Sequence, residues 1–288
     1  MESNCAGVKI YSALAFLLVI AFLQNGCQKP LNELNSNTPL LDSIVGNNSS
    51  IHFIYDGQGR VIEDRYQLVD TLEERNVYEY HADERAPFTK KHFIKSGITP
   101  DKIAVYRYNT NGQKIYDSTY EPASGYYTAT NISYYGSGKI YLVQAQYTTP
   151  LNIFWRADTI YLNSNGNTDS LKCYWSTTQG NPGSWTYWYS TAFTQYNSAA
   201  NIFKSLSSGN AALNVTAALP WGSFENYYPV VDYFNNNYCT AINTFSPDNA
   251  TYQKQLQFNS NNLPVTGTVT YTNFTGYSDV KHYRFVYR

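Results

Sequence analysis

The sequence has little charge. Asp, Glu, Lys and Arg make up 14% of the 288 residues, and the formal net charge is −1, whereas an average soluble domain is about a quarter charged. A nearly neutral chain creates no strong positive field, so nucleic acid is not expected as a partner. The four His and four Cys do not have the spacing of a structural zinc site, so we expect no metal and no other cofactor.

Familiar catalytic motifs are also missing. The chain has no G-x-S-x-G nucleophile elbow, no H-E-x-x-H helix and no calcium loop. No catalytic residue is therefore assigned. Two carboxylates from distant strands could still form a glycosidase pair, so the sequence leaves an enzyme open as an alternative.

Aromatic residues are abundant instead. They make up 17% of the chain, and 29 of them are Tyr. Tyr, Thr, Val and Phe favour strands, whereas Asn, Gly, Ser and Asp favour turns. This composition predicts an all-β protein.

The N-terminus carries the pattern of a targeting segment. Lys9 precedes an apolar run, residues 10–23, which is too short to span a bilayer comfortably and is typical of a signal peptide. Gly26 and Cys27 follow, in an arrangement that resembles a bacterial lipoprotein signal, although Gln24 and Asn25 replace its usual Leu and small residue. We expect a signal peptide over 1–26, a lipid on Cys27 that anchors the chain to a membrane, a flexible tether over 27–50 and one β-repeat domain over 51–288. An uncleaved anchor or ordinary secretion is the alternative.

Two further cysteines belong to the expected β domain. Cys173 and Cys239 could form a disulfide in an oxidising compartment, and a bond closing so long a loop would stabilise the fold by about 4 kcal/mol. They could equally be two separate buried thiols in strands. The sequence does not decide between these alternatives.

A short frame recurs along the β domain, and Tyr55–Ile62 (YDGQGRVI) is its clearest copy. An aromatic residue ends a strand, Asp or Asn starts a turn, Gly takes the positive φ of a tight hairpin, and a β-branched residue begins the return strand. A dinucleotide-binding loop would need a third Gly where Ile62 stands, and a helix after it. Further copies begin at Tyr108, Tyr134 and Leu162, with weaker ones at Tyr80, Tyr196 and Phe258.

The frame Y-D-x-x-G-R-[VIL] resembles the YD repeat of RHS-type proteins, and Tyr55–Val61 carries it most cleanly. The whole plan is similar to Bacteroidetes-type lipoproteins of unknown function that are built from YD-like strands. The resemblance implies an extended, twisted antiparallel meander of hairpin repeats, curled into a half-barrel or an open shell. It also implies an outer-membrane lipoprotein that faces either the cell surface or the periplasm.

Candidate ligand-binding residues cluster around the turn at 180–183. They are Trp175, Trp185, Tyr187, Trp188 and Tyr189. Strand alternation predicts that Trp185, Tyr187 and Tyr189 share one face and that Trp188 lies on the other. Flat aromatic faces stack on sugar rings, but the same residues could simply pack across strands.

These observations predict a lipid-anchored envelope protein that binds or displays without catalysis. A glycan is the leading ligand, and an envelope protein is the other partner considered. A carbohydrate-active hydrolase and a purely structural or adhesive repeat protein are the alternatives.

Overall fold

The computed structural model describes residues 39–68, 73–82, 84, 86–95, 97–136, 138–149, 152–176, 184–202, 237–245 and 249–288. All of them belong to one compact unit, Pro39–Arg288. The expected signal peptide and Cys27 lie outside the described residues. Within those residues, no helix has the length and apolarity needed to cross a membrane.

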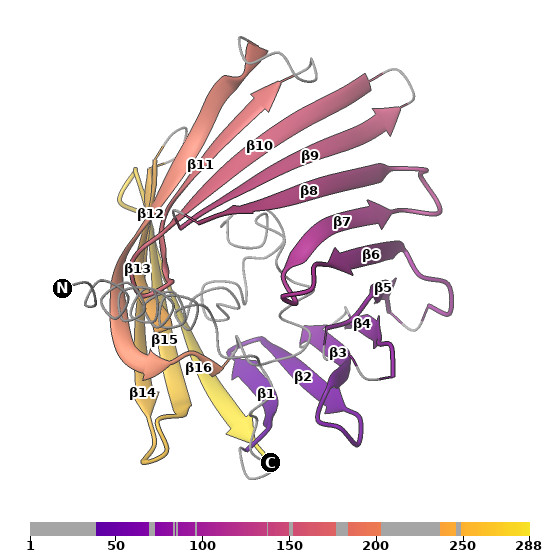
Figure 1. The fold of residues 1–288 in the computed structure, drawn as a ribbon. Helices are drawn as coiled ribbons and strands as arrows, with labels where there is room; N and C mark the ends of the chain where they lie inside the picture. The colour runs from indigo at the N-terminus through magenta and orange to yellow at the C-terminus, as the bar shows by residue number, and fades with distance from the viewer. Residues whose placement is uncertain are drawn as a thin grey trace, which may run out of the picture. The chain divides into compact units, whose positions relative to one another are not determined.

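Sixteen antiparallel strands in the described part of the chain form one closed barrel (Figure 1). The strands are β1 (Leu41–Gly46), β2 (Ser49–Tyr55), β3 (Val61–Leu68), β4 (Glu73–Glu79), β5 (Thr89–Ile94), β6 (Lys102–Tyr108), β7 (Lys114–Tyr120), β8 (Tyr127–Tyr135), β9 (Lys139–Thr149), β10 (Asn152–Leu162), β11 (Thr168–Ser176), β12 (Thr186–Ala200), β13 (Asn237–Phe245), β14 (Ala250–Phe258), β15 (Pro264–Asn273) and β16 (Ser278–Tyr287). Each strand pairs with the next along the chain, so the prediction of an all-β antiparallel meander is confirmed.

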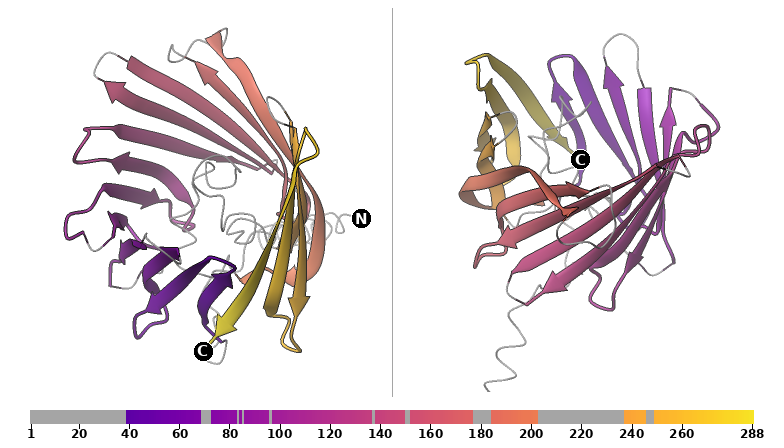
Figure 2. Two further views of the ribbon diagram at one scale, coloured as in Figure 1. Left: turned by 180° about the vertical axis from the view of Figure 1, so that it is seen from behind. Right: turned by 90° about the horizontal axis from the view of Figure 1, so that it is seen from above.

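The meander closes on itself, and the prediction of a half-barrel or open shell is wrong. β1 pairs with β16, with Ile44 opposite Phe285, and the views in Figure 2 show the ring from two more directions. Closure removes both free edges, which would otherwise expose unpaired backbone groups. β1 lies inside the range expected to be a tether, 27–50, so the folded barrel begins earlier in the chain than expected.

The recurring frame forms hairpin turns at most of its copies. In the first copy, the Asp56 carboxylate accepts hydrogen bonds from the backbone N–H groups of Gln58 and Arg60, both at 2.9 Å. Gly59 has φ +74°, which is the left-handed conformation that the turn needs. The hairpin interpretation of this stretch is confirmed. The weaker copy at Tyr196 forms no turn there, because β12 continues to Ala200.

The connections between strands divide into two sets at opposite ends of the barrel. In an antiparallel meander, every second connection lies at the same end. The turns that begin at Asp56, Asn109, Asn163 and Asn259 all follow even-numbered strands, so they share one end, which we call the turn end. Both chain ends of the unit lie there, because the Leu40 N–H donates to the Arg288 carbonyl at 3.2 Å. The opposite end, which carries the β11–β12 connection, is the loop end.

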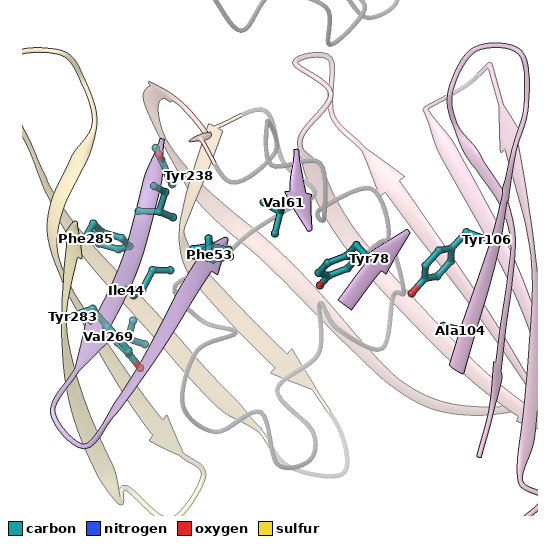
Figure 3. Packing of buried hydrophobic residues seen from close by; sticks show 11 residues of the cluster. Ile44, Phe53, Val61, Tyr78, Ala104, Tyr106, Tyr238, Val269, Tyr283 and Phe285 are labelled. Carbon is teal, nitrogen blue, oxygen red and sulfur yellow. The ribbon is translucent and has the colours of Figure 1, made fainter. Parts of the chain in front are cut away.

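Strand register separates an inward from an outward side of the barrel wall. Phe53, Tyr78, Tyr106 and Phe285 are buried and belong to one hydrophobic cluster (Figure 3). A second cluster, around Leu142, lies on β8–β13. The first cluster joins Tyr106 on β6 to Tyr238 on β13, two strands that are not neighbours in the sheet, so these side chains face inward.

The outward side is polar on much of the wall. On β14 the outward residues include Gln253 and Gln255. On β15, Thr270 stands opposite Gln253 and Thr268 stands opposite Gln255. Burial along both strands alternates accordingly. The inward side of this part of the wall is therefore the apolar side.

Candidate functional site

Three large aromatic side chains are exposed on the inward side of the wall near the loop end. Phe154 on β10 is 44% exposed, Trp175 on β11 is 40% exposed and Trp188 on β12 is 43% exposed. Trp175 stands opposite Arg156 on the neighbouring strand. We call these three residues the aromatic rim.

A β-bulge places Trp188 on this side. Cys173 pairs with Tyr189 and Tyr174 pairs with Tyr187, so Trp188 is the extra residue of β12. A bulge turns two successive side chains toward the same side. The Arg156 guanidinium accordingly lies 5.9 Å from the ring centroids of both Trp188 and Tyr189.

The bulge changes the predicted grouping of the aromatic residues. Tyr187 lies on the outward side, where its ring contacts Tyr174 edge-on at 5.8 Å and its hydroxyl donates to Ser190 at 2.9 Å. Tyr189 is fully buried on the inward side. The prediction that Tyr187 and Tyr189 share a face, with Trp188 opposite, is wrong. Trp185 lies just before β12 and is half-buried.

A buried polar cluster lies beneath the aromatic rim. Arg156 donates to Asp158 at 2.8 Å through Nε and to the Tyr189 hydroxyl at 2.8 Å through Nη2. Burial works against the Arg156 charge, but the nearby Asp158 carboxylate prevails and raises the pKa of Arg156. The guanidinium is therefore a fixed cation beside the rim.

Two buried oxygens of this region are unpaired within the described residues. Asp158 Oδ1 and Thr191 Oγ1 have no hydrogen-bond partner. Unpaired buried polar atoms are uncommon in folded proteins, and they often mark functional sites.

The two cysteines of the barrel are separate. Cys173 and Cys239 are both buried free thiols. They lie on β11 and β13, with β12 between them, and strands are about 4.8 Å apart. A disulfide would need the two strands to move, because bonded Cα atoms are at most about 7 Å apart. Burial raises the pKa of Cys173, so it is an inert thiol rather than a nucleophile.

More polar side chains continue from the rim along the inward side of β8 and β9. Gln144 donates to Thr130 at 3.1 Å, and Gln146 donates to Gln144 at 2.6 Å. Thr130 and Gln144 lie on neighbouring strands in direct register. The inward side near the loop end thus combines flat aromatic faces with amide and hydroxyl groups.

Sequence reasoning found part of this site and missed the rest. Trp175 and Trp188 were predicted, whereas Phe154, Arg156 and Asp158 were not. The signal was present, because an Arg and an Asp two residues apart in a strand share a face, and such a pair is conspicuous in a chain with 14% charge. Within the described residues, no group of three or more His, Cys, Asp or Glu is arranged to hold a metal ion.

No protein-family profile and no curated protein matches the chain. Solved structures that align with the chain include two from Bacteroides species. A porin-like protein from Bacteroides vulgatus ATCC 8482 aligns with a TM-score of 0.53 and 8% identity, over 87% of this chain and 99% of that one. A porin-like protein from Bacteroides uniformis ATCC 8492 aligns with a TM-score of 0.49 and 12% identity, over 86% and 96%. At 8% identity, the likeness to the first structure shows the fold alone.

The prediction of an open YD-repeat lipoprotein is wrong. The described residues form a closed barrel of sixteen strands, and a solved structure whose fold they share is a porin-like protein. The frames that suggested the repeat are hairpin turns of this barrel, and hairpin turns of this kind arise wherever a tight antiparallel connection needs Asn or Asp followed by Gly.

Proposed function

We propose that this chain is a non-enzymatic binding barrel of the bacterial envelope, and that it holds a carbohydrate at the aromatic rim. The observation that carries the proposal is the exposure of Phe154, Trp175 and Trp188 on one inward surface beside Arg156. Large aromatic side chains left in contact with water on a concave wall are typical of ligand sites. Other exposed aromatic side chains, such as Phe274 and Tyr277, lie on the β15–β16 connection and not on the inward side of the wall.

The chemistry of the rim suits a sugar better than an apolar ligand. Ring faces of Trp and Phe can pack against the C–H face of a sugar, while polar groups bind its hydroxyls. Gln146 on β9 stands directly opposite Phe154 on β10, and Gln144 and Thr130 continue the polar surface.

The inward carboxylates support binding rather than hydrolysis. Asp158 is engaged by Arg156, Asp117 by Lys114, and Asp64 accepts a hydrogen bond from Tyr78 at 2.5 Å. A glycosidase needs two carboxyl groups that flank one bond, one of them free to donate a proton. Carboxylates held by separate structural partners do not form such a pair.

A channel is the second candidate, and the closed barrel favours it. A solved structure that shares the fold is a porin-like protein, so an outer-membrane transport role is a natural alternative. A spanning barrel, however, presents an apolar band to lipid all round. The outward residues here include Gln253 and Gln255 on β14 and Glu63 and Arg65 on β3. Solute-flux measurements in liposomes test this candidate directly, and solute-size-dependent flux would favour it over the binding barrel.

Lipid on Cys27 is proposed as the envelope anchor. Pro39 begins the barrel unit, and the chain enters at the turn end, so the aromatic rim at the loop end would face away from the anchored end. Metabolic labelling with an alkyne fatty acid tests the anchor. The wild-type chain should carry the label, and Cys27→Ser should lose it.

A glycan array tests the proposed ligand class. The full chain with Cys27→Ser should bind a defined subset of polysaccharides, and Trp175→Ala should remove that binding without changing the thermal midpoint by more than a few degrees. Silence from a folded chain across neutral and acidic glycans would overturn the proposal.

A further inference from the structure

One flank of the outer wall differs from the rest in having almost no charge. On β8, β9 and β10, the outward positions that strand register defines include a single charged residue, Lys139. The outward positions of β3–β5 instead carry both signs in close succession, as Glu63, Arg65, Arg75 and Lys91 show. We call the outward side of β8–β10 the uncharged flank.

Aromatic residues stand at both ends of this flank. Near the loop end, Tyr127 is opposite Tyr147, and their ring centroids are 5.5 Å apart. Near the turn end, Lys139 stands between Tyr135 on β8 and Tyr161 on β10. The flank is therefore bordered by tyrosines whose rings and hydroxyls suit a boundary between apolar and wet surroundings.

Apolar and uncharged polar residues share the middle of the flank, where Asn131 and Ser133 on β8 are exposed and Ala145 and Ala157 are buried. Ala145 stands between Ala129 and Trp155 on the neighbouring strands, and Val143 stands opposite Ala157. From Lys139 to Tyr147, a strand rise of about 3.4 Å per residue and a tilt of about 40° give a height of about 20 Å. Membrane barrels place an apolar band of about 25 Å between two aromatic girdles. The flank has tyrosines at both ends, separated by nearly the same height, and no charged residue between them.

Two lysines add a basic edge at the turn end. The Nζ atoms of Lys139 and Lys172 lie 5.9 Å and 5.8 Å from the Tyr161 ring centroid. Neither lysine forms an ion pair with a residue of the described strands. Basic side chains beside aromatic ones are attracted to anionic lipid headgroups.

We propose that the uncharged flank is a lipid-contact surface. The Trp155 region lies against the acyl boundary of a membrane, and Lys139 and Lys172 lie at its anionic headgroups. The polar and charged outward residues of β3–β5 and β14–β15 stay in water, so the barrel touches the lipid along one side and does not span it. The charge complementarity of the basic edge favours a lipid surface over a second copy of the chain.

Fluorescence quenching by brominated phospholipids tests this contact on the full chain in vesicles that contain an anionic lipid. The N-terminal apolar run can itself enter lipid, so binding to vesicles is not the readout; the depth of Trp155 is. Quenching should be clear in the wild-type chain and largely lost in Trp155→Phe. The matched variant Trp188→Phe, which changes the rim, should keep it.

Other outcomes would overturn the proposal. Equal quenching of the wild type and Trp155→Phe would place a different tryptophan in lipid, and no quenching of either would exclude the contact. A lipid-independent dimer that Trp155→Arg dissociates would assign the flank to a second copy. Replacing Lys139 and Lys172 by Gln should reduce quenching on anionic vesicles and not on neutral ones. If the replacement changed quenching equally on both kinds of vesicle, the two lysines would not contact anionic headgroups. None of these results depends on glycan binding.

Discussion

The hydroxyl of Tyr80, just after β4, donates a hydrogen bond of 2.6 Å to the backbone carbonyl of Val61, the first residue of β3. The same relationship recurs round the turn end, where a Tyr at the end of an even strand bonds the residue at the start of the strand before it. It joins Tyr55 to Leu41, Tyr108 to Pro87, Tyr134 to Lys114, Tyr196 to Thr168 and Tyr287 to Pro264.

This ring of tyrosines explains the aromatic residue of the sequence frame. The hydroxyl ties a hairpin end to its neighbour on the inward side, where water competes little. Burial accordingly raises the pKa of Tyr134 to about 12. The frame tyrosines are thus structural, and the candidate ligand contacts are different residues.

Replacing Tyr80 by Phe tests the role of this hydrogen bond. The ring and its contact with the Arg60 guanidinium, 4.7 Å away, remain, and only the hydroxyl is lost. The free energy of unfolding should fall by about 1 kcal/mol. Tyr120→Phe, which changes an exposed tyrosine, is the matched control and should change it by less than about 0.5 kcal/mol. If urea titrations gave the same loss of unfolding free energy for both variants, the Tyr80 hydrogen bond would not stabilise the barrel more than an exposed tyrosine hydroxyl does.

The buried Lys114–Asp117 pair should be costly to break. Nζ lies 2.9 Å from Oδ2, and the two side chains are 0% and 5% exposed. Asp117→Asn removes the carboxylate that balances the ammonium and should destabilise the barrel by about 3–5 kcal/mol. The double variant Lys114→Met, Asp117→Leu should recover most of that loss. A double variant as unstable as the single one would show that packing, and not charge, holds this position.

His92 should make the barrel less stable in mild acid. Burial, together with Lys90 and Lys102, lowers the pKa of His92 to about 4, so it is neutral at pH 7 despite Glu74 at 4.0 Å. Between about pH 6.5 and pH 4 the unfolded chain binds a proton that the folded chain does not, so the free energy of unfolding falls as the pH falls. The full effect is up to about 3 kcal/mol.

Denaturant titrations at pH 7, 5.5 and 4.5 measure this effect. His92→Gln should flatten the profile between pH 6.5 and pH 4, because Gln does not titrate. An unchanged profile in His92→Gln would contradict the assignment of the acid sensitivity to His92.

The turns offer a paired test of backbone conformation. Gly112 has φ +71° and open space where a Cβ would stand, so Gly112→Ala should cost about 1 kcal/mol through backbone strain alone. Asn262 has φ +57° at the equivalent place of another turn. Asn262→Gly should be neutral or slightly stabilising. Thermal unfolding distinguishes the two, and the opposite order would contradict the assigned turn conformation.

The sequence predicts the strands and turns well because both are local. The hairpin frames need only a few neighbouring residues, and Asn262 keeps its turn without Gly because Asn tolerates positive φ. Closure is different, since it depends on Ile44 meeting Phe285 across nearly the whole chain. No local pattern reports that contact, so the sequence predicts a tether where β1 forms.

In the candidate site, too, the sequence predicts the local features and misses those that depend on strand register. That Trp175 and Trp188 flank a hairpin follows from the turn that the sequence predicts at 180–183. Their common side follows from a one-residue bulge opposite Cys173 and Tyr174. A bulge shifts every later side chain to the other face. Strict alternation therefore misplaced Tyr187, and only the register of the folded sheet corrects it.

The most direct test of the account compares two neighbouring aromatic residues that face opposite ways. Trp188 is 43% exposed on the inward side and Tyr187 is 46% exposed on the outward side, so each is equally available to a ligand that reaches its side. For the glycan that binds best, equilibrium titration should show that Trp188→Ala raises Kd at least tenfold, about 1.4 kcal/mol, while Tyr187→Ala leaves Kd unchanged. An unchanged Kd in Trp188→Ala, or an equal rise in both variants, would contradict a carbohydrate site on the inward rim.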